Sequence, residues 1–253
     1  MSYPSTLDSH GMRNWATRAV GELAHRRDEI NALNVFPVPD SDTGSNMAHT
    51  MEAAVAELDN GGDVADSLAL GAVRGARGNS GMVLSQVLRG VAESTVDSVI
   101  DGDVFARSLQ QAVELVDRAI AEPVEGTVIT VLKAAAEAAD DAEAQSGATL
   151  HSIVSAAIAA AETALKRTPS QLPALREAGV VDAGGAGLVI LLESLLAEIE
   201  GSTGHTGLSE PEPDTELEVV FFFEGDIDTL QVAITPLGDS LVIARATEDS
   251  ANV

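Results

Sequence analysis

The feature that most constrains the fold is a succession of segments in which apolar residues recur every three or four positions. In residues 12–31 this spacing places Trp15, Ala19 and Leu23 roughly on one face, as an amphipathic helix requires. Similar segments follow, and glycines punctuate several of them. They cover residues 43–58, 64–76, 80–94, 103–121, 127–143, 148–166 and 185–199. The pattern therefore predicts about eight helices, all before residue 200.

Composition supports a helical fold. Aromatic residues make up only 3% of the chain, whereas alanine and valine are abundant. Small side chains let helices approach one another closely, so this composition favours packed helices over a β-sandwich. The predicted fold class is all-α.

The charge balance excludes several functions. The chain has 14 Lys and Arg against 40 Asp and Glu, which gives a formal net charge of −26. A polyanion without a basic stripe does not bind nucleic acid by neutralising phosphates, and anionic membrane surfaces repel it. The absence of cysteine excludes disulfides, thiolate metal sites and cysteine nucleophiles. No secretory signal and no apolar run of membrane-spanning length is visible, so we expect a cytoplasmic protein without an integral membrane segment.

The character of the sequence changes after the last predicted helix. A stretch rich in Gly, Pro and polar residues is typical of a linker. Strands are predicted at residues 217–223 and 241–244, and residues 227–234 fit a short helix or a strand. Two strands cannot bury a sheet face alone. The expected organisation is a helical domain over residues 1–200, a linker over 201–216 and the incomplete beginning of an α+β domain over 217–253.

The strongest motif follows the first predicted helix and reads Asn34-Val-Phe-Pro-Val-Pro-Asp-Ser-Asp-Thr-Gly-Ser-Asn-Met. Its carboxylates, Asp40 and Asp42, stand between a proline-stiffened stretch and a helix start. Mg²⁺ favours one or two carboxylates together with substrate phosphates. Free amides at the helix start, with the hydroxyls of Thr43 and Ser45, can meet those phosphates. The alternative is that the aspartates only cap the helix; the two prolines, the upstream Asn and the following Gly-Ser-Asn favour metal binding.

A second motif, over residues 71–85, is rich in glycine. Its glycines, including Gly81, let the backbone approach a ligand closely. Asn79 and Ser80 stand at the start of a long apolar helix. The motif resembles a phosphate cradle but lacks the lysine of a Walker loop. A tight helix crossing with Asn79 as a cap explains the spacing equally well.

Two further stretches border predicted helices. In Gly-Val-Val-Asp-Ala-Gly-Gly-Ala-Gly, Asp182, Gly184 and Gly185 precede an apolar helix. An aspartate beside such a turn can reach a nucleoside edge, although a plain interhelical turn is the commoner explanation. Thr127 also stands at a helix start, where a threonine is more often the first residue of the helix than a ligand contact.

Taken in order, these motifs resemble the N-terminal domain of the ATP-binding subunit of bacterial fatty acid kinases. That domain is similar to the nucleotide-binding subunit of dihydroxyacetone kinase. The resemblance covers about residues 12–200. It implies an eight-helix barrel with ATP or ADP and two Mg²⁺ ions at one mouth.

The resemblance also implies roles for individual residues. Asp40 and Asp42 match metal-ligating aspartates, and Asn34 is a candidate for the third ligand because Val35 stands where dihydroxyacetone kinases have an aspartate. The family usually has glycine where this chain has Ser41. The residues matched to phosphate contacts are Thr43, Ser45, Asn46, Asn79, Ser80 and Gly81. Those matched to the border of the nucleoside are Thr127, Asp182, Gly184 and Gly185.

The implied function is phosphoryl transfer. Fatty acid kinase moves the γ-phosphoryl group of ATP to the carboxylate of a fatty acid that a separate fatty-acid-binding protein holds, and so makes an acyl phosphate. The tail resembles the beginning of the next domain, so we expect a fragment that binds nucleotide and metal but is a weak kinase alone. A homo-oligomer is compatible with the sequence. The alternatives are a dihydroxyacetone-kinase-like nucleotide subunit and a non-catalytic adenine-nucleotide module that docks a partner through residues 221–223.

Overall fold

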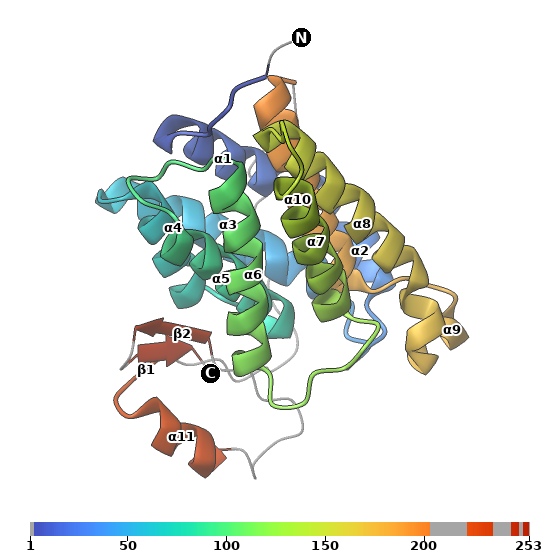
Figure 1. The fold of residues 1–253 in the computed structure, drawn as a ribbon. Helices are drawn as coiled ribbons and strands as arrows, with labels where there is room; N and C mark the ends of the chain where they lie inside the picture. Colours follow the sequence, from blue (N-terminus) through green and yellow to red (C-terminus); the bar gives the residue numbers. More distant parts are fainter. Residues whose placement is uncertain (1–2, 203–221, 235–243, 248–249, 253) are drawn as a thin grey trace.

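A computed structural model describes residues 3–202, 222–234, 244–247 and 250–252 (Figure 1). The first of these ranges is helical almost throughout. Its helices are α1 (Ser9–His25), α2 (Arg27–Leu33), α3 (Thr43–Glu57), α4 (Val64–Arg74), α5 (Gly78–Ser94), α6 (Gly102–Ala119), α7 (Val128–Glu143), α8 (Leu150–Gln171), α9 (Pro173–Ala178) and α10 (Ala183–Glu200). A 3₁₀ turn, η1 (Leu58–Asn60), extends α3.

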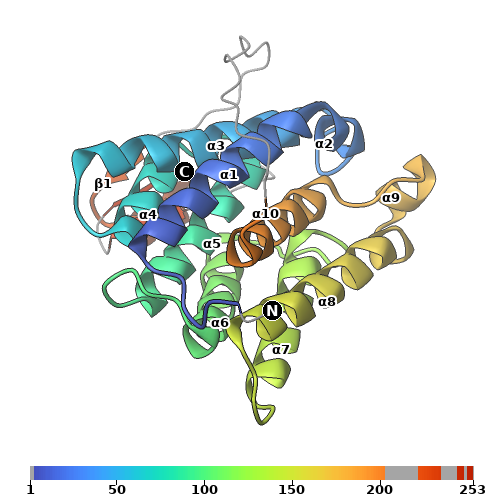
Figure 2. The same ribbon diagram turned by 90° about the horizontal axis from the view of Figure 1, so that it is seen from above.

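Eight of these helices form a closed ring. Each packs against the next in the order α1, α3, α4, α5, α6, α7, α8 and α10, and α10 returns to α1. Figure 2 views the ring from above. The prediction of an all-α fold with eight principal helices is confirmed. The short helices α2 and α9 accompany the ring, and α9 was not predicted.

Two helices differ most clearly from the prediction, while the other helix ends shift by a few residues. The first predicted helix is interrupted at Arg26, where φ is −99° and ψ is 11°, so α1 and α2 are separate. Helix α8 continues to Gln171 although Pro169 lies inside it. Proline has no N–H for the carbonyl four residues earlier. That carbonyl, of Leu165, accepts a 2.7 Å hydrogen bond from the Thr168 hydroxyl, so a side chain replaces the missing backbone donor.

Small residues let the ring close tightly. Gly90 of α5 lies so near α6 that a Cβ added to it would come within 2.9 Å of Ala112, including two of its backbone atoms. The single tryptophan, Trp15, is buried between α1 and α10 and donates its indole N–H to the Leu191 carbonyl at 3.2 Å. The Trp15 hydrogen bond therefore joins the two ends of the ring, and the close contact of α5 with α6 tightens it elsewhere.

Helix α10 is apolar around most of its circumference. Twelve of its residues are buried, because it contacts α1, α3, α7 and α8. Within the described residues, no helix combines the length and the hydropathy that crossing a membrane requires.

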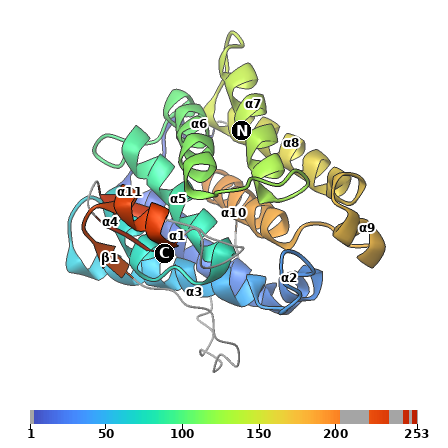
Figure 3. The ribbon, with the colours of Figure 1, turned by 90° about the horizontal axis from the view of Figure 1, so that it is seen from below.

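The two ends of the barrel differ. At one end, the segment before α1 pairs with the α5–α6 connection through two backbone hydrogen bonds between Leu7 and Ile100, of 2.7 and 2.8 Å. At the other end, toward which Figure 3 looks, the α6–α7 connection leads into α7. A small apolar pocket lies among the N-terminal parts of α3, α5, α7 and α10, and Met47, Ser80 and Gly184 help to line it. We call this end the mouth.

Three short strands and one helix make up the described part of the tail. Strands β1 (Phe222–Glu224), β3 (Ser250–Asn252) and β2 (Ala244–Thr247) form an antiparallel sheet in that order, and β2 contacts α4 and α5. Helix α11 (Ile227–Ile234) settles the open choice between helix and strand for that segment. Strand β3 was not predicted. Most of the predicted linker and strands, over residues 203–221 and 241–243, lies outside the described residues.

We predict that Gly90→Ala lowers the free energy of unfolding by about 1–3 kcal/mol, because overpacking at a helix crossing forces α5 and α6 apart. This loss should exceed the gain in helix propensity, which is up to about 1 kcal/mol. Urea unfolding followed by circular dichroism measures it. Gly102→Ala is the matched control, since the one atom closer than 3.8 Å to its added methyl group is Cδ1 of Ile153, the far end of a side chain rather than backbone. Wild-type stability of Gly90→Ala would contradict the close approach.

Candidate functional site

Two side-chain amides orient the carboxylates of the loop between α2 and α3. Asn34 donates through Nδ2 to Asp40 and, at 3.5 Å, to Oδ1 of Asp42. Asn46, in the first turn of α3, donates to Oδ2 of Asp42 at 2.7 Å. Asn34 is buried and Asp40 is exposed, so a buried amide holds two carboxylates together at the surface. Converging carboxylate oxygens of this kind suit a hard divalent cation.

Helix α3 is not capped by the motif's aspartates. Asp42 occupies the N-cap position, yet its carboxylate makes no capping bond to a backbone N–H of the helix. Asn31 of α2 provides the cap instead: its Oδ1 accepts the N–H groups of Gly44 at 2.7 Å and Ser45 at 3.1 Å, and its Nδ2 donates to the Ser45 hydroxyl at 3.0 Å. The aspartates are thus not used as caps. The first amides of α3, which we expected to meet phosphate, are already bonded.

Ser41 stands between the two aspartates in a left-handed conformation, with φ of 60°. A non-glycine residue in this region costs on the order of 1 kcal/mol. Glycine adopts the same conformation without that cost, so Ser41→Gly would relieve it.

The start of α5 contrasts with that of α3. Its N-cap residue, Arg77, makes no side-chain capping bond, and Gly78 turns the chain into the helix with φ of 61°. Within the described residues, nothing accepts the N–H groups of Asn79 and Ser80, and their side chains make no hydrogen bond. Uncapped amides at a helix start form a ready anion-binding arrangement.

Glycines of the second motif serve helix crossings. A Cβ on Gly81 would lie 2.3 Å from Oγ1 of Thr50, and one on Gly75 would lie 2.2 Å from the Ala53 side chain. Both glycines therefore let the α4–α5 region lie directly on α3. A ligand contact by Gly81 stays a prediction.

Asp182 joins the starts of α7 and α10. Its Oδ2 accepts the Gly185 N–H at 2.7 Å, and its carboxylate also accepts the N–H of Val128. Burial raises the pKa of Asp182 to about 6, against the lowering effect of these two hydrogen bonds. The neighbouring Thr127 hydroxyl donates to the Val124 carbonyl at 2.8 Å. Thr127 and Asp182, the two polar side chains among the four residues predicted to border the nucleoside, therefore lie at helix starts with their polar groups bonded within the protein.

The pocket at the mouth brings the separate motifs together. Met47 comes from the first motif, Ser80 from the second and Gly184 from the third, and Val128 adds the start of α7. Thr43, which is buried, begins α3 one turn before Met47. Three stretches that are far apart in sequence thus surround one opening.

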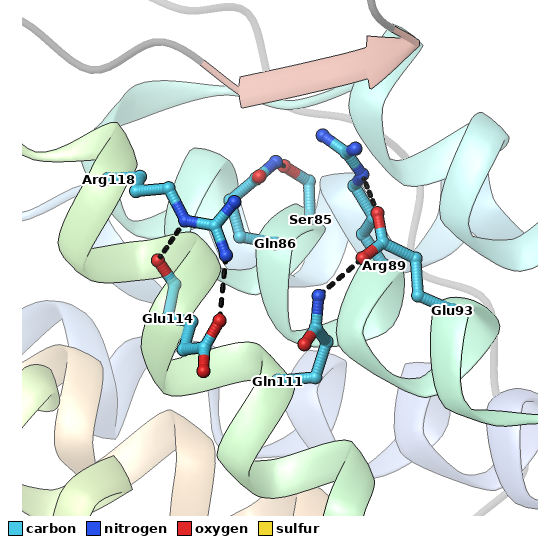
Figure 4. Close-up of polar contacts among 7 residues, drawn as sticks. All are labelled: Ser85, Gln86, Arg89, Glu93, Gln111, Glu114 and Arg118. Atoms are coloured by element: carbon cyan, nitrogen blue, oxygen red, sulfur yellow. Dashed lines mark hydrogen bonds and ion pairs between the residues drawn. The ribbon is translucent and has the colours of Figure 1, made fainter.

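A second polar cluster lies on α5 and α6 outside the mouth (Figure 4). Glu93 accepts hydrogen bonds from Arg89 Nε at 2.7 Å and from Gln111 Nε2 at 2.6 Å, and Arg118 pairs with Glu114 at 2.8 Å. Surface ion pairs of this kind contribute about 1 kcal/mol or less. The cluster is a surface network of matched charges.

The mouth offers two carboxylates to a metal. In the part of the chain that the structure describes, no three His, Asp or Glu side chains gather closely enough to hold an ion. A cation at Asp40 and Asp42 would complete its shell with water and phosphate oxygens, as Mg²⁺ commonly does. Asn34 turns its amide nitrogen, a donor, toward the carboxylates, so it orients them; direct ligation by its oxygen stays a prediction.

The chain matches one known domain family over more than half of its length. Residues 37–197 match the DAK2 domain. The chain belongs to the DAK2 domain family. This DAK2 chain is 39% identical over 204 residues to protein YloV of Bacillus subtilis, with 78% of this chain and 37% of YloV covered. It is 36% identical over 213 residues to an uncharacterized protein of Staphylococcus aureus USA300, with 82% and 39% covered. It spans less than two-fifths of the length of these relatives.

The DAK2 fold is also similar to solved structures. The native dihydroxyacetone kinase of C. freundii aligns with a TM-score of 0.53 at 18% identity, over 78% of this chain and 36% of that one. The same enzyme in complex with AMP-PNP and Mg²⁺ aligns with a TM-score of 0.50 at 19% identity, over 74% and 33%. At these identities the likeness establishes the fold.

Two residues of the candidate site could not be identified from the sequence. Asn31, which caps α3, stands 13 positions ahead of the first amide that it accepts. Thr50, buried in α3, accepts the Arg77 N–H from 27 positions away. A cap is normally sought in the residue directly before the helix, so neither contact has a local signal.

Asp182 makes stability depend on pH. Its pKa is about 6 in the folded protein against an ordinary value of 3.8, so the folded state binds the proton more tightly. As pH rises from 4 to 7, its contribution to the free energy of unfolding should therefore fall, by up to about 3 kcal/mol. We predict that Asp182→Asn, which does not titrate, gains stability relative to the wild type over this range.

Urea unfolding of both proteins at a series of pH values measures the difference. Asp101→Asn is the matched control, because Asp101 caps α6 at an exposed position through the Val104 N–H at 2.9 Å. Parallel pH profiles of the wild type and Asp182→Asn would contradict the prediction.

Proposed function

We propose that this DAK2 domain binds ATP or ADP together with Mg²⁺ at the mouth of the barrel, as the nucleotide-binding part of a phosphotransferase. One observation carries the proposal: Asp40 and Asp42 are oriented by amides at the start of α3, and α5, which packs against α3, begins with amides that no side chain caps. The carboxylates can bind the cation, and the helix amides can bind phosphate. Membership of the DAK2 family and a fold like that of dihydroxyacetone kinase support the same assignment.

A cation reconciles the acidic protein with an anionic ligand. Bound Mg²⁺ would neutralise phosphate charge and stabilise the transferring group. Asp40 and Asp42 would hold it, with Asn34 and Asn46 keeping them in place. Two ions, as the resemblance implies, would share these ligands with the phosphates.

The remaining predicted residues divide between phosphate and nucleoside. The amides and side chains of Asn79 and Ser80 would bind phosphate oxygens, and Gly81 keeps that turn against α3. On α3 the hydroxyls of Thr43 and Ser45 would contribute in place of the capped amides. Residues that would border the nucleoside are Thr127, Asp182, Gly184 and Gly185.

We further propose that the acceptor is a fatty acid carboxylate, presented by a separate fatty-acid-binding protein. A carboxylate oxygen would form a bond to the γ-phosphorus as the bond from that phosphorus to the β–γ bridging oxygen breaks, which yields an acyl phosphate and ADP. The carboxylate is ionised at neutral pH, so the domain needs no general base. Support comes from the order and spacing of the motifs. Because the chain covers 37% of YloV, we assign this step to the longer protein.

We predict that Asp40→Asn and Asp42→Asn each lower the affinity for ATP in the presence of Mg²⁺ by at least about tenfold, because each loses a charged metal ligand. Isothermal calorimetry with Mg²⁺, repeated with EDTA, measures this effect. Asp141→Asn is the matched control, since Asp141 is an exposed aspartate in the last turn of α7. Wild-type affinity in both site variants would refute the metal assignment.

A second test addresses the acceptor. Acyl phosphate can be trapped with hydroxylamine after ATP, Mg²⁺ and a loaded fatty-acid-binding protein are mixed with this chain or with a full-length relative. We expect product from the longer protein and little from this chain. Equal turnover would show that the additional length is dispensable, and phosphorylation of dihydroxyacetone instead would favour the other kinase assignment.

A further inference from the structure

A single buried hydroxyl connects the two halves of the proposed site. Thr50 lies in α3 with 0% of its surface exposed. Its Oγ1 donates to the Asn46 carbonyl at 2.7 Å and accepts the backbone N–H of Arg77 at 3.2 Å. Arg77 is the N-cap residue of α5. Thr50 therefore fixes the position of the uncapped start of α5 relative to α3.

The same chain of contacts reaches the candidate metal ligands. Asn46, whose carbonyl accepts the Thr50 hydroxyl, donates its side-chain amide to Asp42 at 2.7 Å. Asp42, Asn46, Thr50 and Arg77 are thus joined by three consecutive hydrogen bonds. The carboxylate lies at one end of this chain and the start of α5 at the other.

Packing reinforces the connection. Gly81, one turn into α5, leaves only enough room for the Thr50 hydroxyl, because a Cβ there would lie 2.3 Å from Oγ1. A threonine in a helix often bonds the carbonyl four residues earlier, and that bond alone would be structural. The additional bond to Arg77 and the fit against Gly81 give Thr50 a role between helices.

We propose that Thr50 is a positioning residue that couples cation binding at Asp42 to phosphate binding at the start of α5. The inference rests on the proposed function. If the start of α5 moves relative to α3, a phosphate on its amides and a cation on the aspartates no longer meet on one nucleotide. The phosphate and the cation each still bind, but the binding of one raises the affinity for the other less than in the wild type.

The coupling is measured as the factor by which Mg²⁺ raises the affinity for ATP, from calorimetry with Mg²⁺ and with EDTA. Thr50→Val removes the hydroxyl and Thr50→Ser retains it. We expect this factor to be about tenfold smaller in the valine variant than in the wild type, which is a usual size for coupling between sites. In the serine variant it should be close to the wild-type value. Thr50→Ala removes the hydroxyl without pressing a methyl group on Gly81 and gives the same comparison if the valine variant does not fold.

Ser194→Ala is the matched control. Ser194 is buried in α10, donates to the Ile190 carbonyl at 2.7 Å and makes no other hydrogen bond among the described residues. Its replacement removes a bond of the same helical kind without touching α5. The Mg²⁺ factor should stay at the wild-type value even if the protein is less stable.

A second readout needs no ligand. In the free protein, hydrogen exchange of the Arg77 amide, followed by NMR, should be faster in Thr50→Val than in the wild type and in Thr50→Ser. A wild-type Mg²⁺ factor in Thr50→Val, or an equal loss in Thr50→Ser, would overturn the coupling. Unchanged exchange at Arg77 would overturn the contact on which it depends. Failure of the wild type to bind ATP would refute the proposed function, and the coupling with it, even where the exchange result is as expected.

Discussion

Helix α3 is the element on which the rest of the structure depends, because five other helices meet it. It contacts α1, α2, α4, α5 and α10. Three of them approach through a glycine: Gly71 of α4, Gly81 of α5 and Gly187 of α10. A larger residue at any of these crossings would displace α3, and Asp42 and Asn46 would move with it. The packing that closes the barrel is thus the packing that places the candidate ligands.

Neutral side-chain amides orient the carboxylates at the mouth. Asn34 and Asn46 donate to the two carboxylates, and Asn31 takes the first amides of α3. A neutral donor fixes the direction of a carboxylate without cancelling its charge, unlike an arginine or lysine. The protein is strongly acidic overall, and at the mouth specific hydrogen bonds fix the orientation of two of its carboxylates.

The fold could be predicted to a large extent because each helix carries its own apolar period. Two features could not be predicted. One is the interruption at Arg26. The other is the continuation of α8 past Pro169, which depends on the Thr168 hydroxyl. The site could be predicted in part. Spacing places Asp182 at a helix start, but its burial and its bond to Val128 arise from a distant helix. Spacing identifies candidate residues, whereas tertiary contacts decide which of their polar groups are engaged.

The ring is closed by its first and last helices, and this has a consequence for synthesis. The Trp15 indole and the Leu191 carbonyl bond across 176 positions. Until α10 has left the ribosome, one flank of α1 lacks its partner and the helices form an open arc. The mouth also lacks Gly184, which α10 supplies. Domains generally fold as units as the chain emerges, so the newly made chain gains a complete barrel and a complete mouth in the same step, when α10 emerges.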